Sequence, residues 1–199
     1  MADFCTVQDV AEVLQIEISD ADKVASCQRA IAEATAAIRN YCKQYIELVE
    51  DDEETFDVRP ARWNLLLSEL PVVEVSAVVE DGETLTVDDD YELGAYGQLW
   101  RVNRRWAVGN QIVTVTYSHG HDEIPDDIVA VCSRAAGRVY QAGLRSADAD
   151  GVPGVASKSL GDYSVSFAAE GSEGVMGVSA ARMLLLSEKD VLNKYRVDP

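Results

Sequence analysis

The stretch that decides the fold is NQIVTVTYSHGHDEIPDDIVAVCSRAAGRVYQ, residues 110–141. Its first part, residues 111–117, is dense in β-branched side chains, which predicts a strand buried on at least one face. Gly120 ends this pattern. Pro125 and the two aspartates behind it favour a helix start, because proline fixes φ and carboxylates suit the positive end of a helix. From there apolar residues recur every three or four positions, so the sequence predicts a strand, a tight turn and a helix.

Two further helices are expected before this stretch. Residues 6–14 form a short one, which opens on a capping-box pattern. Residues 19–45 form a long one, because apolar side chains step by three or four positions along a narrow stripe. Together with the helix that follows Pro125, they predict a helical body made of residues 1–46 and 119–143.

Residues 47–118 are expected to form an insertion between the two parts of the helical body. Its first segment, residues 47–57, holds seven carboxylates and no basic residue, which is typical of a solvated loop. It lacks the ligand spacing and central glycine of an EF-hand calcium loop. From Thr55 onward, β-rich segments alternate with turn signals, which predicts a small antiparallel β-unit. Its strands are expected at residues 55–59, 64–67, 72–80, 83–87, 91–93 and 98–102.

Residues 144–199 are expected to form a flexible C-terminal arm. Residues 144–159 are rich in glycine, alanine, serine and aspartate, which indicates a loop. A strand follows at residues 161–168 and a helix at residues 179–195, and the strand places three apolar side chains on one face: Tyr163, Val165 and Phe167. The predicted fold class is therefore α+β, a mainly helical bundle with an inserted small antiparallel β-unit and a strand-plus-helix arm.

The composition limits the classes of function. The 199 residues suffice for one domain with a sizeable core. With 35 acidic and 17 basic residues the net charge is -18 and the isoelectric point is near 4.3. A protein whose main role is to grip DNA needs the opposite sign of charge. The sequence shows no signal peptide and no apolar run long enough to span a membrane, so no membrane association is expected.

The four cysteines show no CxxC spacing. We therefore expect buried, free thiols in a reducing compartment rather than metal ligands. They are Cys5, Cys27, Cys42 and Cys132.

The two histidines, His119 and His121, lie in the segment HGHDE. With a third ligand from elsewhere they could bind a metal, so a small metal-dependent hydrolase is one alternative function. A polar strand-to-helix turn is the simpler interpretation. The sequence contains no GxSxG, GxGxxG, GxxxxGK[ST] or HExxH motif, so no catalytic residue, cofactor site or metal site is assigned.

One basic cluster stands out in this acidic chain, Arg101, Arg104 and Arg105, flanked by Trp100 and Trp106. It could contact DNA in a channel by stacking and phosphate contacts. The favoured interpretation is a hairpin tip with cation–π contacts, or a site that docks an acidic partner surface. Because the β-segments just before it carry acidic residues and no basic one, complementary patches on neighbouring copies of the chain are also expected.

Five stretches, in this order and spacing, resemble the head-to-tail connector (adaptor) proteins of long-tailed double-stranded DNA phages. Together they cover most of the chain, and they read VQDVAEVL, AIAEATAAIRNYCKQYI, ELPVVEVSAVVEDGETL, VTVTYSHGHDEIPDDIVAVCSRAAGRVY and SLGDYSVSFA. The family's aromatic-containing turn before the proline appears here as residues 117–121. His121 replaces an aromatic residue there, which argues against His121 as a metal ligand.

The resemblance implies a structural virion protein without enzymatic activity or cofactor. It implies a dodecameric ring in the phage neck, between the portal and the next neck or tail-terminator protein, made in the host cytoplasm. Such a ring extends the DNA channel, passes DNA without reading its sequence, and serves virus assembly and genome ejection. In that family the C-terminal segment reaches the portal, which here implicates Tyr163, Val165, Phe167, Met183 and Leu184. A monomeric bacterial binding domain with a β-rich face is the remaining alternative.

Overall fold

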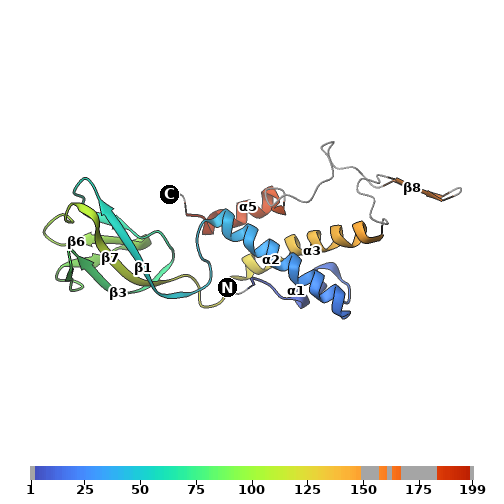
Figure 1. The fold of residues 1–199 in the computed structure, drawn as a ribbon, viewed down its shortest axis with the longest axis horizontal. Helices are drawn as coiled ribbons and strands as arrows, with labels where there is room; N and C mark the ends of the chain where they lie inside the picture. The colour runs from blue at the N-terminus through green and yellow to red at the C-terminus, as the bar shows by residue number, and fades with distance from the viewer. Residues whose placement is uncertain (1–2, 149–156, 161–162, 167–182, 198–199) are drawn as a thin grey trace. The chain divides into compact units, whose positions relative to one another are not determined.

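The computed structural model of the chain describes residues 3–148, 157–160, 163–166 and 183–197. Within them, helices and antiparallel sheets gather in separate parts of the molecule (Figure 1). The α+β class is therefore as predicted. The prediction of a mainly helical bundle is wrong, because seven of the described strands build two sheets that share a core of their own.

The chain divides into two compact units, each described here by itself. The helical unit contains residues 3–38 and 127–189, and the β unit contains residues 39–126 and 190–199. The β unit thus interrupts the helical unit in the sequence. The last residues of the chain group with the β unit, although the sequence suggested a separate arm.

Three helices of the helical unit begin close to their expected positions. In α1 (Val7–Leu14) the Thr6 hydroxyl accepts a hydrogen bond from Asp9 N, and the Asp9 carboxylate accepts one from Thr6 N, which completes the capping box. The other two are α2 (Ala21–Cys42), which belongs to this unit up to residue 38, and α3 (Asp126–Asp148). Their buried side chains recur at helical spacing and include Cys27, Ile31, Ala34, Ile38, Ile128, Val131, Cys132 and Ala135.

The β unit is built from two antiparallel sheets. The first has the strand order β1-β7-β3-β4, with β1 (Val49–Val58), β7 (Gly109–His119), β3 (Val72–Glu80) and β4 (Glu83–Thr84). The second has the order β2-β6-β5, with β2 (Asn64–Leu66), β6 (Gln98–Arg101) and β5 (Tyr91–Leu93), and a 3-10 turn at Ala95–Gly97.

A single apolar core fills the β unit. Trp106 and Tyr117 are the largest side chains buried in it, and both sheets contribute to it: Val58, Leu65, Leu67, Val78, Leu85, Tyr91, Leu99, Val113 and Val115. β7 supplies the centre because it pairs with β1 on one side and β3 on the other. The β-branched alternation that opened the sequence analysis therefore marks the middle of a sheet.

The acidic segment at residues 47–57 is not a solvated loop, and that prediction is wrong. Most of it forms β1, which pairs with β7 and places Phe56 opposite Val113. Side chains of β1 alternate, so that Val58 is buried while Glu53 and Asp57 are exposed. Because β1 is an edge strand, its outward carboxylates stay in water, and the charge run is compatible with a strand.

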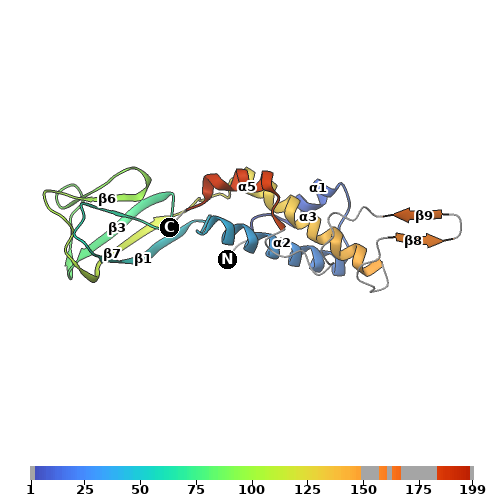
Figure 2. The same ribbon diagram turned by 90° about the horizontal axis from the view of Figure 1, so that it is seen from above.

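The described part of the C-terminal segment differs in its elements from the predicted loop, strand and helix. α3 takes up the beginning of the predicted loop at residues 144–159, and β8 (Ser157–Leu160) takes up its end. β8 pairs antiparallel with β9 (Tyr163–Ser166) to form a hairpin (Figure 2). The last helix is the short α5 (Leu186–Leu192), continued by a 3-10 turn at Asn193–Tyr195. The predicted start of this helix, at residue 179, lies outside the described residues.

Candidate functional site

The C-terminal segment is anchored to the helical unit by Arg138 of α3. The Arg138 guanidinium donates to both carboxylate oxygens of Glu188, at 2.8 and 2.6 Å, and to the Met183 carbonyl oxygen at 2.8 Å. The side chain of Glu188 is only 4% exposed. A bidentate contact of this kind fixes geometry as well as charge, so the segment around residues 183–188 is held firmly on α3.

A second anchor holds the end of the chain within the β unit. The Tyr41 hydroxyl donates to Asn193 Oδ1 at 2.7 Å, and Gln44 Nε2 donates to the Tyr195 carbonyl oxygen at 2.6 Å. Val197 N donates to the carbonyl oxygen of Cys42 at 3.1 Å. The hairpin β8–β9 therefore lies in the sequence between α3 and a doubly anchored C-terminal end.

The residues predicted to contact a portal fall into three groups. Tyr163 and Val165 lie on β9, at the register positions opposite Leu160 and Lys158. Phe167 lies outside the described residues. Met183 and Leu184 are only 4% and 6% exposed, so these side chains pack inside the helical unit and do not offer a free surface.

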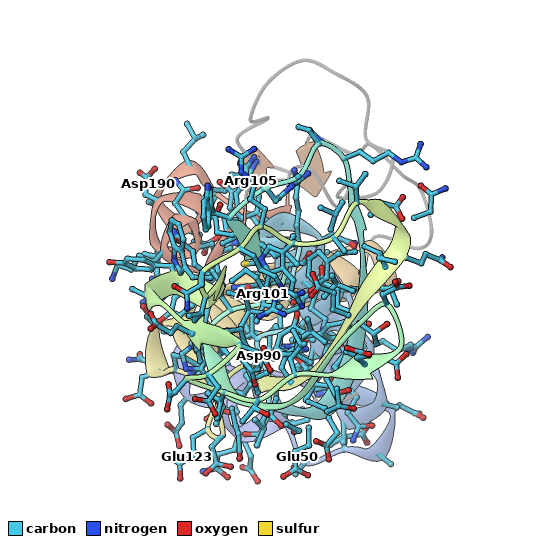
Figure 3. All side chains as sticks on the ribbon, turned by 90° about the vertical axis from the view of Figure 1, so that its left-hand side faces the viewer. Glu50, Asp90, Arg101, Arg105, Glu123 and Asp190 are labelled. Atoms are coloured by element: carbon cyan, nitrogen blue, oxygen red, sulfur yellow. The ribbon has the colours of Figure 1, made fainter. Side chains whose placement is uncertain are left out.

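Arg101 of the predicted basic cluster serves the interior of the β unit. Its side chain is 1% exposed, and its Nε atom lies 3.1 Å from an oxygen of the equally buried Glu80. The guanidinium also donates to the Asp90 carbonyl oxygen and lies over the Trp106 ring. Figure 3 shows Arg101 inside the β unit near Asp90, with Arg105 at its periphery. Sequence reasoning missed this role, because the partner carboxylate is supplied by β3, far away in the sequence.

Arg104 and Arg105 are the members of the cluster that reach the surface. The side chain of Arg104 is 61% exposed and contacts Glu80 at 3.0 Å. The Arg105 guanidinium lies 5.8 Å from the centre of the exposed Trp63 ring. A shallow hollow of about 350 Å³ lies beside both arginines and is also lined by acidic residues: Glu80, Asp81 and Glu83.

Several large apolar side chains of the β unit are also exposed, and their exposure was not recognised from the sequence. Five large side chains on or next to the β2-β6-β5 sheet are between 42% and 80% exposed: Trp63, Leu66, Leu93, Tyr96 and Trp100. Leu66 and Trp100 lie on the same face of this sheet, because Leu66 pairs with Gln98, two residues before Trp100, whereas Leu93 pairs with the buried Leu99 on the other face. The available signal was the alternation of β6, which buries Leu99 and Arg101 and turns Trp100 outward.

The two histidines have different environments. His119 is fully buried, and its Nε2 atom lies 3.2 Å from Asp52 Oδ2, whereas His121 packs its ring against Tyr195. Burial raises the pKa of the nearby Glu69 carboxyl, and the hydrogen bond from Tyr45 N opposes that rise. Among the residues that the structure describes, no group of three or more His, Cys, Asp or Glu side chains is arranged to hold a metal ion.

The turn between the histidines has a structural role. Gly120 has φ +94°, and a Cβ atom there would collide with the carbonyl oxygen of Glu47. Gly120 N donates to the Pro71 carbonyl oxygen, and His121 N donates to that of Ile46. The predicted tight turn is thus confirmed, because only glycine fits this backbone conformation and this close approach.

None of the described helices is long and apolar enough to span a membrane. The chain belongs to the head completion protein family, whose model matches residues 3–133. A search of the curated proteins finds no match.

Two solved structures of phage-like particles contain similar chains. One is the neck of an empty GTA particle computed with C6 symmetry, with 15% identity and a TM-score of 0.50 over 98% of this chain and 91% of that chain. The other is the neck of a native GTA particle computed with C12 symmetry, with 11% identity and a TM-score of 0.45 over 97% of this chain and 88% of that chain. At 15% identity, the similarity to the neck chain of the empty GTA particle shows a shared fold only.

Proposed function

We propose that the protein is a structural component of the neck of a phage-like particle, where it completes the head. In this role it forms a dodecameric ring between the portal and the next neck or tail protein and extends the DNA channel. Membership of the head completion protein family supports the role, as does the fold shared with a neck chain of a GTA particle. A net charge of -18 suits a channel through which DNA slides without being held.

The proposed portal contact is supported by two anchors that hold the chain after the hairpin, one before α5 ends and one at the turn that follows it. Arg138 fixes residues 183–188, and Tyr41 and Gln44 fix the turn at Asn193–Tyr195. Between α3 and these anchors the chain forms the hairpin β8–β9. A hairpin can add its edge to a sheet of a partner, with backbone hydrogen bonds for affinity and alternate side chains for register. We therefore assign portal contact to the hairpin rather than to Met183 and Leu184.

The test replaces the hairpin and keeps both anchors. Truncation of the whole segment from residue 157 would also remove Met183, Leu184 and Leu192, which are buried, and would expose apolar cores. Replacement of residues 157–166 by a glycine–serine linker of equal length avoids this. We expect unchanged thermal unfolding and loss of co-sedimentation with the assembled portal of the same particle. Retained binding by this variant would contradict the assignment.

Contact between neighbouring copies is assigned to Arg104, Arg105 and Trp63 on one copy and the acidic strand β1 on the next. The arginines are the exposed members of the basic cluster, and β1 carries exposed carboxylates along a sheet edge. In the same assay, a variant with Arg104→Glu and Arg105→Glu separates the two contacts. We expect this variant to bind the portal through its intact hairpin, and we expect electron microscopy to show incomplete rings. Complete rings of this variant would exclude the arginines from the copy-to-copy contact.

A further inference from the structure

Two buried thiols meet in the helical unit. Cys5 lies just before α1 and Cys132 lies on α3, 127 residues further along the chain, yet their Sγ atoms are 3.2 Å apart. Both cysteines are free. A disulfide bond has an S–S length of about 2.0 Å, so the sulfur atoms need to approach by only roughly 1 Å. Cys27 and Cys42, the other two cysteines, are also buried and free.

The surroundings of the pair hold the segment before α1 against both long helices. Thr35 of α2 lies with its hydroxyl 3.6 Å from Cys132 Sγ and accepts a hydrogen bond from Phe4 N at 3.2 Å. Phe4 and Cys5 are 2% and 6% exposed, and Cys132 is fully buried. Residues 3–6 belong to no helix, so a local opening of this segment suffices to admit a small reagent without unfolding α3.

We propose that Cys5 and Cys132 are a latent disulfide site, which closes when the protein meets a small-molecule disulfide in an oxidising medium. The covalent bond then ties the segment before α1 to α3. Thiols of this kind stay reduced in a cytosol and oxidise outside it, including in particles released from a cell. Neither the ring nor the portal contact is required for this step, because all the groups involved lie in one helical unit.

The reaction is a pair of thiol–disulfide exchanges with oxidised glutathione. The Cys132 thiolate attacks one sulfur of the reagent, forms a mixed disulfide and releases one glutathione thiolate. The Cys5 thiolate then attacks Cys132 Sγ and releases the second glutathione. The two thiol protons end on the two reduced glutathione molecules, so atoms and electrons balance. The hydrogen bond that Cys5 donates lowers the pKa of Cys132 and raises the pKa of Cys5, which favours Cys132 as the first nucleophile.

The experiment uses the full chain, purified with reductant and then incubated with oxidised glutathione. The protein is then unfolded in denaturant without reductant, the remaining thiols are alkylated, and the intact mass and a peptide map are recorded. We expect a loss of two hydrogen atoms, a peptide that links Cys5 to Cys132, and alkylated Cys27 and Cys42. The midpoint temperature of thermal unfolding should rise by at least about 5 °C on oxidation, because the bond closes a long loop. It should return to its first value when reductant is added.

Matched variants make the outcome decisive. Cys27→Ser should keep the mass change and the thermal shift, whereas Cys5→Ala should lose both while it still folds. Four alkylated cysteines after oxidation of the folded protein would overturn the proposal. So would a map that links Cys5 to Cys27 or Cys42, or a thermal shift that persists in Cys5→Ala.

Discussion

At the scale of single residues, the pair formed by Arg101 and Glu80 governs the stability of the β unit. Glu80 accepts hydrogen bonds from Arg101, from Arg104 and, at 2.7 Å, from Ala107 N. We expect Glu80→Ala to lower the free energy of unfolding by about 3–5 kcal/mol, because it leaves the buried Arg101 charge without its main partner. Arg104→Ala is the control and should cost less than about 1 kcal/mol, since that side chain is largely exposed. Urea unfolding followed by tryptophan fluorescence measures both; equal costs would contradict the assignment.

Gly120 and Gly143 offer a second comparison at this scale. Gly120 has positive φ and lies against the backbone of Glu47, whereas a Cβ atom on Gly143 of α3 meets nothing within 4 Å. We expect Gly120→Ala to destabilise the protein by about 1–3 kcal/mol. Gly143→Ala should stabilise it by up to about 1 kcal/mol, because alanine favours helix. Chemical denaturation of the two variants should therefore move the midpoint in opposite directions, and a neutral Gly120→Ala would show that the turn tolerates a side chain.

Glu69 gives the stability of the β unit a dependence on pH. Burial raises its pKa above the usual 4.5, with His119 opposing and Asp52 and Glu54 reinforcing the rise. An acid whose pKa is raised by folding contributes stability below the unfolded pKa and loses it as pH rises through the folded pKa. Relative to Glu69→Gln, the wild type should therefore lose stability from about pH 4.5 upward until both states are ionised. Urea midpoints of the two proteins between about pH 5 and 8 test this; parallel curves would contradict it.

At the scale of elements, local sequence patterns predicted where helices and strands lie better than they predicted which segments are paired and which are exposed to solvent. β7 and α3 were predictable because their periodicity is strong and their ends carry Gly120 and Pro125. β1 was not predictable, because the seven carboxylates of residues 47–57 indicate a segment in solvent. Its strand conformation comes from pairing with β7, which the local sequence does not show. The hairpin β8–β9 was half predicted: the apolar alternation of β9 was visible, but the polar partner strand carries no such signal.

The short α5 depends on one long-range contact. Arg138→Met keeps much of the side-chain volume but removes the donors to Glu188 and to Met183. We expect hydrogen exchange of the backbone amides in residues 183–188 to become faster, because α5 is too short to be stable alone. Ser187→Ala, a substitution of an exposed residue on the same helix, serves as the control. Unchanged exchange in Arg138→Met would mean that apolar packing alone holds α5.

At the scale of the whole molecule, the alternation of helical and β-rich segments was predictable from the sequence. The contact between the C-terminal end and residues 41–44 was not. The groups that anchor the C-terminal end lie far from it in the sequence, and polar pairs such as Gln44 with Tyr195 have no periodic pattern. The basic cluster is visible in the sequence as Arg101, Arg104 and Arg105. Its division into a buried Arg101 and exposed Arg104 and Arg105 depends on the fold of two sheets around Trp106.

The acidic edge strand β1 has a consequence for the behaviour of the protein in solution. The exposed carboxylates of Glu50, Asp51, Glu53 and Asp57 lie along a strand that ends the four-stranded sheet. Identical edges repel each other while these groups are ionised, so the charges keep an otherwise open hydrogen-bonding edge from seeding fibrils. Near the isoelectric point of about 4.3 the chain has no net charge, so this repulsion is lost and the same edge becomes a template for stacking. We therefore expect preparations held near this isoelectric point to turn from a clear solution into insoluble β-rich material, which light scattering and a β-sheet infrared band would detect.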